Sequence, residues 1–274
     1  EEATVMAGTW THPCLRPSPS PNSLFLLPSL RPPRTPPPPT GGRRRPRLVV
    51  AGGAMVEIRV CVNRSCNRMG SRETLALLSD ISPPGISVCS CGCLGRCGAG
   101  PNLVVLPAGV LVGHCGTPAR AAELLAEICG GKRGEGSFDP WKNLEALALR
   151  KKAEVELLER GNPAEAEALL SQAIGLKPCG GLHIIYKSRS VARLVLGNIV
   201  SALEDADEAL RIAPMFPQAY ICQGDAFMAM EEWSKAEKAY SEALLIDPSI
   251  RRSKSFKDRI TRLQEKVVAV SISN

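Results

Sequence analysis

The spacing of apolar residues predicts β-strands in the first half of the chain. Residues 56–62 alternate between apolar and polar positions and are rich in β-branched side chains, a pattern typical of a strand. Shorter apolar runs at 86–89, 102–106 and 110–112 predict three more strands. The turn residues at 107–109, with the sequence PAG, favour a hairpin between the last two.

Two helices are predicted beside these strands. Residues 71–79 have a helical period, and Ser71 is placed to cap the first turn. Thr117 is followed by Pro118, a pair that favours a helix start, and the helical pattern runs to about residue 128. The order strand, helix, three strands, helix predicts a small sheet flanked by helices, which we assign to residues 55–131.

The second half of the chain has a helical period throughout and repeats itself. Alanine and proline recur at equivalent places, first 36 and then 34 residues apart. Small alanines let the two helices of a unit pack closely, and a proline ends each second helix. The aligned positions are Ala166, Ala202 and Ala236; Ala173, Ala209 and Ala243; and Pro178, Pro214 and Pro248.

This repeat resembles the tetratricopeptide repeat, a helix pair of about 34 residues. The resemblance covers three units over 139–248, and Gly224 stands where this family carries a glycine for close helix contact. A helix over 249–270, with one apolar stripe and a basic face, is expected to cap the end of the array. The expected fold class is therefore α+β, with a small α/β domain followed by an all-α solenoid.

Composition separates a third segment, residues 1–54. It holds 12 of the 23 prolines and seven arginines, and no acidic residue lies between Glu2 and Glu57. Such a segment cannot bury enough apolar surface to fold, so we expect a disordered tail. Read from Met6, it resembles an organelle transit peptide, which implies a chloroplast or plastid protein. A disordered cytoplasmic tail, or initiation at Met55, is the alternative.

Charge and hydropathy limit the function of the remaining chain. The net charge of +7 falls to +2 once residues 1–54 are set aside, which does not indicate a nucleic-acid surface. No apolar run approaches the ~20 residues of a membrane span. No acid–base pair, nucleotide loop or nucleophile constellation is evident, so we expect no turnover enzyme. Residues 132–138 are charged and glycine-rich and are expected to form a flexible linker.

Cysteines carry the candidate chemistry, because six of the eleven lie between residues 61 and 97. Two pairs follow two predicted strands: Cys61 and Cys66, with four residues between them, and Cys93 and Cys97, with three. Loops at neighbouring strand ends can meet in space. Two such pairs supply the four thiolates that a 2Fe–2S cluster needs.

The runs CVNRSC and CGCLGRCGAGPNLVVLP resemble the thioredoxin-like 2Fe–2S ferredoxins and the related flavoprotein subunit of respiratory complex I. The resemblance covers about 75 residues and implies a thioredoxin-like fold. It assigns the cluster ligands to Cys61, Cys66, Cys93 and Cys97. The spacer of 26 residues between the pairs is shorter than in the complex I type, and the extra Cys89 and Cys91 are candidate substitute ligands.

Other interpretations of the cysteines stay open. Zinc sites favour C-x2-C spacing, so a zinc site is an alternative that this spacing fits less well. A dithiol enzyme needs a C-x-x-C motif, which the chain lacks. A cysteine module that binds no metal is the third alternative. Cys115 and Cys129 are expected to be buried as small apolar residues.

The array is expected to bind a protein or peptide in a groove lined by the first helix of each unit. Chaperone-binding tetratricopeptide proteins hold a C-terminal carboxylate there with a clamp of Lys, Asn and Arg. The matching positions here are Lys151, Val155, Ser188, Gln218 and Cys222, and only Lys151 fits, so we predict no clamp of that kind. The candidate groove residues are Lys151, Lys152, Lys187, Ser188, Val191, Gln218, Ile221, Cys222 and Asp225.

These observations predict an interaction scaffold that carries a 2Fe–2S module for electron transfer or redox sensing within a protein complex. The alternative is a pure tetratricopeptide adaptor, or a co-chaperone-like protein, whose cysteine module holds zinc or nothing. A redox partner protein is expected only in the first case.

Overall fold

The structure is a computed structural model that describes residues 55–130 and 138–273, without the side chains of 270–273. The expectations for residues 1–54, and for the linker up to residue 137, therefore lie outside the described residues. The disordered tail, the transit peptide and the flexible joint stay predictions.

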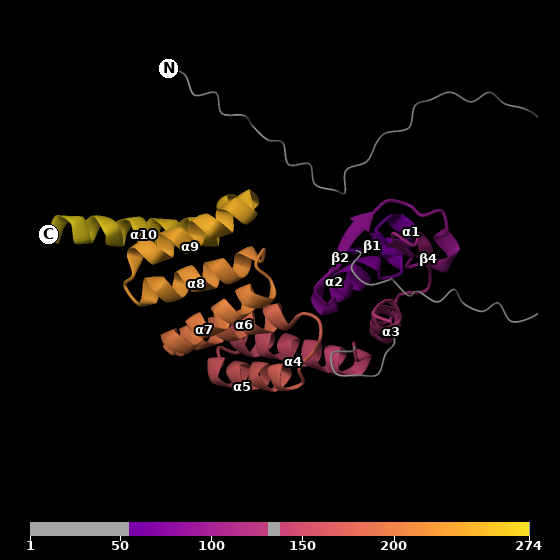
Figure 1. Cartoon of the computed structure of the whole chain (residues 1–274), viewed down its shortest axis with the longest axis horizontal. Helices are drawn as coiled ribbons and strands as arrows, with labels where there is room; N and C mark the ends of the chain where they lie inside the picture. Colours follow the sequence, from indigo (N-terminus) through magenta and orange to yellow (C-terminus); the bar gives the residue numbers. More distant parts are fainter. Residues whose placement is uncertain (1–54, 131–137, 274) are drawn as a thin grey trace, which may run out of the picture. The chain divides into compact units, whose positions relative to one another are not determined.

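A four-stranded sheet forms the centre of the first domain (Figure 1). Its strands are β1 (Val56–Cys61), β2 (Ile86–Cys91), β3 (Leu103–Leu106) and β4 (Val110–Val112), in the order β2-β1-β3-β4. β1 runs parallel to β2 and antiparallel to β3, and β3 and β4 form the predicted hairpin. The alternation expected of β1 is confirmed, because Val56, Ile58 and Val60 are buried.

Three helices accompany the sheet: α1 (Arg64–Arg68), α2 (Ser71–Ile81) and α3 (Pro118–Ile128). Thr117 caps α3 as predicted, since its side chain accepts a hydrogen bond from the Arg120 amide. The cap predicted for α2 is wrong. Gly70 is the N-cap, and Ser71 is buried with no hydrogen-bond partner for its hydroxyl. The short helix α1 was not predicted, because five residues are too few for a visible period.

The core of the sheet domain continues into the first helix of the array. Phe138 and Leu147 belong to the same buried cluster as Leu78 and Ile128. The Arg150 side chain, which is 8% exposed, binds the Asp80 carboxylate at 2.8 Å.

Three helix pairs follow, as the repeat predicts. They are α4 (Pro140–Leu158) with α5 (Pro163–Gly175), α6 (Leu182–Val195) with α7 (Ile199–Ile212), and α8 (Pro217–Ala229) with α9 (Trp233–Ile246). Each helix lies beside the next in Figure 1. The repeated alanines are fully buried at the contacts. They are Ala166, Ala173, Ala202, Ala209, Ala236 and Ala243.

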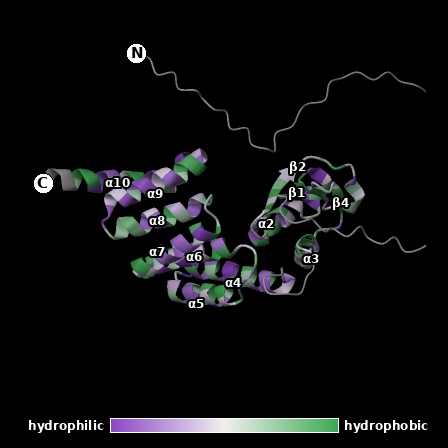
Figure 2. Cartoon of the chain, in the orientation of Figure 1, coloured by the Kyte–Doolittle hydropathy of each residue, from purple (hydrophilic) through white to green (hydrophobic). Residues whose placement is uncertain are grey.

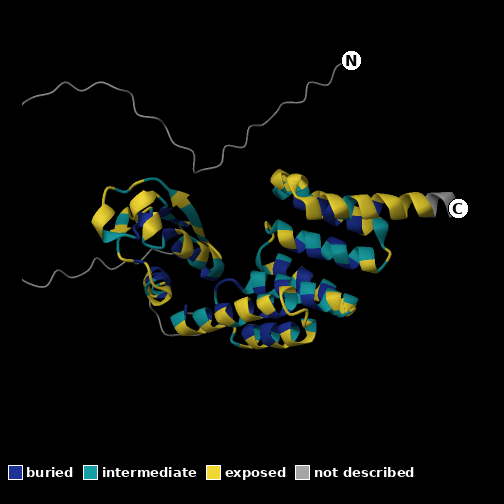
Figure 3. Cartoon of the chain, turned by 180° about the vertical axis from the view of Figure 1, so that it is seen from behind, coloured by how far each residue is buried: buried dark blue, intermediate teal, exposed yellow. Residues whose placement is uncertain are grey.

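The chain ends in a short turn, η2 (Pro248–Arg252), and a long helix, α10 (Lys254–Ser273). Phe256 and Leu263 bury the predicted apolar stripe against α9, while the opposite face of α10 is exposed in Figure 3. Purple and green positions mix along every helix of the array in Figure 2, as expected of helices that each bury one stripe. Among the described helices, none combines the length and apolarity that a bilayer crossing requires.

Candidate functional site

The four predicted ligand cysteines line one small cavity. Cys61 ends β1, Cys66 lies on α1, and Cys93 and Cys97 lie in the loop that follows β2. These segments meet because β1 and β2 are parallel neighbours, so the loops that leave their carboxyl ends lie together. The cavity has a volume of about 100 Å³, and Asn63, Leu94 and Asn102 complete its walls with nearby polar residues.

The two cysteine pairs differ in their surroundings. Cys61 and Cys66 are buried, whereas Cys93 and Cys97 are exposed. The Cys93 and Cys97 sulfurs are 3.7 Å apart. Two thiolates on one tetrahedral metal, with metal–sulfur bonds of about 2.3 Å, lie about 3.8 Å apart. The second pair is therefore already spaced to share one metal atom.

The acidity of the thiols reflects this arrangement. Burial raises the pKa of Cys61, and the neighbouring Cys66 thiol raises it further. The Gly95 amide, which donates to Cys93 at 3.4 Å, lowers the pKa of Cys93. The pKa of Cys97 is raised, first by its hydrogen bond with Cys93, and the charge of Cys66 also acts on it. The two pairs thus interact electrostatically across the cavity.

Asn102 is a residue of this site that the sequence analysis missed. It is buried, and its side-chain amide donates to the Cys66 sulfur at 3.5 Å and to the Arg96 carbonyl at 2.6 Å. The second contact fixes the loop that carries Cys97, and the first places a donor on a sulfur. Hydrogen bonds of this kind orient and tune metal-ligating thiolates.

The candidate substitute ligands lie elsewhere. Neither Cys89 nor Cys91 lines the cavity. The Cys89 thiol donates to Glu57 Oε1 at 3.1 Å, and Cys91 stands opposite Cys61 in the β1–β2 register. Of the other two cysteines, Cys115 is buried as predicted. The prediction for Cys129 is wrong, because it caps the end of α3 and is exposed.

Four thiols in two pairs are a ligand set that suits either a two-iron cluster or a single zinc ion. Among the described residues, no three Cys, His, Asp or Glu side chains are grouped closely enough to hold a single ion. A 2Fe–2S cluster takes four thiolate ligands, and the Gly95 amide lies beside one of the four thiols of the cavity.

The predicted groove residues lie on α4, α6 and α8, the first helices of the three units. Lys151, Lys152 and Gln218 are exposed. Four are half-buried: Lys187, Val191, Ile221 and Asp225. Ser188 and Cys222 are buried, so they present little surface to a ligand. Burial, helped by the charge of Asp225, raises the pKa of Cys222 to about 12.

A network of arginines crosses the second unit and was not predicted. Arg189 on α6 makes a two-fold contact with Asp205 on α7, at 2.9 and 2.7 Å. Arg193 binds the same carboxylate at 3.0 Å and Glu167 on α5 at 2.7 Å. Because these charges neutralise one another, they tie three helices together and leave little free charge for a ligand.

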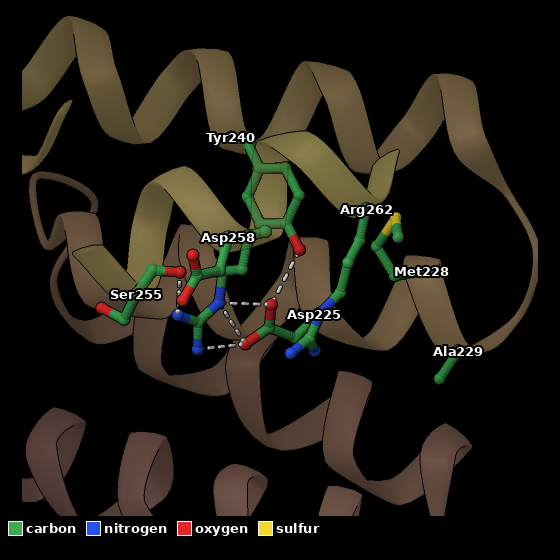
Figure 4. A pocket seen from close by; sticks show the side chains of 8 residues that line it. Asp225, Met228, Ala229, Tyr240, Ser255, Asp258 and Arg262 are labelled. Carbon is green, nitrogen blue, oxygen red and sulfur yellow. Dashed lines mark hydrogen bonds and ion pairs between the residues drawn. The ribbon is translucent and has the colours of Figure 1, made fainter. Parts of the chain in front are cut away.

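A second hollow of about 490 Å³ lies between α8, α9 and α10. Asp225 is its central group (Figure 4): the Tyr240 hydroxyl donates to it at 2.7 Å, and Arg259 on α10 donates to both of its oxygens at 2.7–2.9 Å. Arg262 and Asp258 also line this hollow. Of the polar residues named here, only Asp225 was predicted from sequence. The others come from α9 and α10, which are not first helices of a unit.

Comparison with known proteins identifies the repeat. The family model "Tetratricopeptide repeat" matches residues 217–250. These residues are a tetratricopeptide repeat. They comprise α8, α9 and the start of η2, the unit in which the repeat pattern is clearest.

Similar proteins match only part of the chain. The chain is 32% identical over 122 residues to an Hsp70-Hsp90 organising protein of Plasmodium falciparum, a match that covers 44% of this chain and 46% of that protein. It is 31% identical over 83 residues to heat shock protein STI1 of Saccharomyces cerevisiae, covering 30% of this chain and 14% of that one. The chain thus spans less than half the length of these relatives. The first tetratricopeptide domain of human RPAP3 has a similar structure, with a TM-score of 0.42 and 19% identity over 47% of this chain and 98% of that one.

Proposed function

We propose that this protein is an adaptor that holds a segment of a partner protein in the groove of its tetratricopeptide array. The observation that carries the proposal is the array itself: three helix pairs in series, one of which matches the repeat family. Such arrays act through extended concave surfaces. This interpretation favours the adaptor alternative over the scaffold whose main task is electron transfer.

Chaperones are the first class of partner to test, because the similar proteins include Hsp70-Hsp90 organising proteins. The groove chemistry restricts how a chaperone would bind. A C-terminal carboxylate requires unpaired cations, yet Val155, Gln218 and Cys222 stand at three of the five clamp positions. We therefore propose that a chaperone binds through a segment other than its terminal carboxylate.

The test compares three ligands by fluorescence polarisation or calorimetry: intact Hsp90, Hsp90 without its last five residues, and the isolated peptide SRMEEVD. Intact and shortened Hsp90 are expected to bind equally, and the peptide weakly. Loss of binding on shortening would refute the clamp prediction. Absence of binding to Hsp90 and Hsp70 alike would refute the partner class.

A matched pair of variants tests whether the partner binds in the groove. Lys151→Glu with Lys152→Glu changes exposed charges on α4, in the groove. Lys254→Glu with Lys257→Glu makes the same change of charge on exposed positions of α10. The first variant is expected to weaken partner binding at least tenfold, and the second to leave it unchanged.

The second candidate function belongs to the cysteine module, and the shared cavity of four sulfurs favours it. We infer that Cys61, Cys66, Cys93 and Cys97 hold a 2Fe–2S cluster. The strand order β2-β1-β3-β4 is consistent with a thioredoxin-like fold. In that site Asn102 donates to a ligand sulfur, and the Gly95 amide donates to another. A bound cluster supplies one-electron transfer.

Anaerobic reconstitution with iron and sulfide, followed by absorption, EPR and metal analysis, tests this candidate. We expect a 2Fe–2S spectrum that bleaches with dithionite. Cys93→Ser should abolish it, whereas Cys129→Ser, which changes an exposed cysteine outside the cavity, should not. One zinc per chain, or no metal, would instead support the adaptor with a zinc-bound or empty module.

A plastid location is the remaining proposal, and it depends on the composition of residues 1–54. Import into isolated chloroplasts, with determination of the mature N-terminus, tests it. Import with cleavage near residues 50–54 is expected, and a chain that stays outside with its full mass would contradict the proposal.

A further inference from the structure

Three arginines lie in the two segments that carry Cys66, Cys93 and Cys97. Arg64 and Arg96 line the cysteine cavity, and Arg68 lies in the last turn of α1. All three side chains are exposed. Within the described part of the chain, none of them is paired with a carboxylate. We call these three residues the arginine rim.

The rim arginines differ from several arginines of the helical half, which are paired with acids. Arg189, Arg193 and Arg259 all bind carboxylates at 2.7–3.0 Å. Around Cys93, Arg96 and Cys97 no acid is close in sequence. Between Asp80 and Glu123 the chain contains no acidic residue. Because Arg64, Arg68 and Arg96 are exposed and form no ion pair in the metal-free chain, an anionic group from outside can approach them.

We propose that the arginine rim is the docking surface for an acidic face of another protein, which covers the exposed Cys93 and Cys97 when it binds. The proposal rests on the role inferred above for the cysteine cavity as a working site. Charge complementarity of this kind steers encounter and fixes orientation more than it adds affinity.

Two other occupants fit the observations less well. A small anion is usually held by buried donors, but the rim side chains are exposed and come from two separate segments. A nucleic acid needs a long basic track of roughly 6–10 phosphate contacts. Residues 55–274 carry a net charge of only +2, so the rim is a local patch and not part of such a track.

The test is a protection experiment on the metal-free, reduced full-length chain. The neutral reagent 4,4′-dithiodipyridine modifies thiols, and mass spectrometry follows each cysteine separately. The probe is a peptide of 20 glutamates. It is expected to slow modification of Cys93 and Cys97 about tenfold at 20 mM salt, and hardly at all at 500 mM, because salt screens the rim. Cys129, exposed at the end of α3, is the internal control and should be unaffected.

Variants assign the effect to the rim. The triple change of Arg64, Arg68 and Arg96 to Glu should abolish protection, and the milder change of all three to Gln should reduce it strongly. Circular dichroism shows whether each variant folds, and the Gln variant keeps the test valid if the Glu variant does not. The control carries the same change of charge on η2 and α10, at Arg251→Glu, Arg252→Glu and Lys254→Glu, and should keep full protection.

Three results would overturn the proposal. They are protection that survives in both rim variants, equal protection by inorganic phosphate at the same concentration of charge, and stronger protection by a 20-nucleotide thymidine strand than by the peptide. Failure of cluster assembly would not produce any of these results, since the thiols are read without metal. The absorption experiment above reports that failure separately.

Discussion

Gly224 offers the sharpest test of how the third helix pair packs. A β-carbon added there would lie 2.6 Å from Cδ1 and 2.9 Å from Cζ of the Tyr240 ring. The ring atom Cε1 would be closer still. Carbon atoms in contact prefer about 3.5–4.0 Å, so Gly224→Ala requires the ring or the helix to move by about 1 Å or more. The glycine thus sets the distance between α8 and α9.

Movement of the Tyr240 ring would disrupt contacts that stabilise the core. Tyr240 is 1% exposed, its hydroxyl donates to Asp225 at 2.7 Å, and its ring meets Phe256 edge-on with centroids 5.7 Å apart. Overpacking a core costs about 1–3 kcal/mol. Weakening the hydrogen bond to a charged carboxylate adds about 1 kcal/mol. The better helix propensity of alanine offsets about 1 kcal/mol of this. We expect a net loss of about 2 kcal/mol in the free energy of unfolding.

Gly175→Ala is the matched control, because the same change in α5 meets no atom within 4 Å. It should leave stability unchanged or raise it by up to about 1 kcal/mol. Urea unfolding followed by circular dichroism at 222 nm measures both variants. In a Tyr240→Leu background, the cost of Gly224→Ala should fall by about 1 kcal/mol, as expected for residues in contact. If Gly224→Ala is as stable as Gly175→Ala, the packing argument is wrong.

Three further predictions concern single side chains. Arg259→Gln removes the guanidinium that binds Asp225 and should speed hydrogen exchange in α10. Because the pair is partly exposed, the free energy of unfolding should fall by only about 1 kcal/mol. Unchanged exchange would show that the pair does not anchor the helix. Burial favours the neutral thiol of Cys222 and raises its pKa to about 12, whereas the pKa of Cys93 is lowered. Iodoacetamide at pH 8 should therefore label Cys93 at least 100-fold faster than Cys222, as measured by mass spectrometry. Ser71→Ala removes a buried hydroxyl without a partner and should be neutral or stabilising in urea unfolding; a loss above about 1 kcal/mol would reveal a missing partner.

The sequence by itself determined the elements whose causes are local. The helix of α3 begins at Thr117 because a capping oxygen and the following proline act within one turn. The three helix pairs follow from the repeated alanines and prolines, and the glycine at 224 is needed where the pattern placed it. The two cysteine pairs were also visible, since each lies within six residues of sequence. Two of the failures were local too: at Ser71 a glycine took the capping place, and five residues of α1 gave no period.

Only the tertiary structure decided which distant groups meet. The cysteine pairs share a cavity because β1 and β2 are parallel neighbours, and Asn102 reaches Cys66 from the start of the hairpin, 36 residues later in the chain. Arg259 finds Asp225 across 34 residues in the same way. Such contacts depend on how whole elements pack, and residue spacing along the chain does not encode that packing directly. The spacing could therefore name the thiols and the arginines next to them in sequence, while the fold alone brought the Asn102 amide to Cys66.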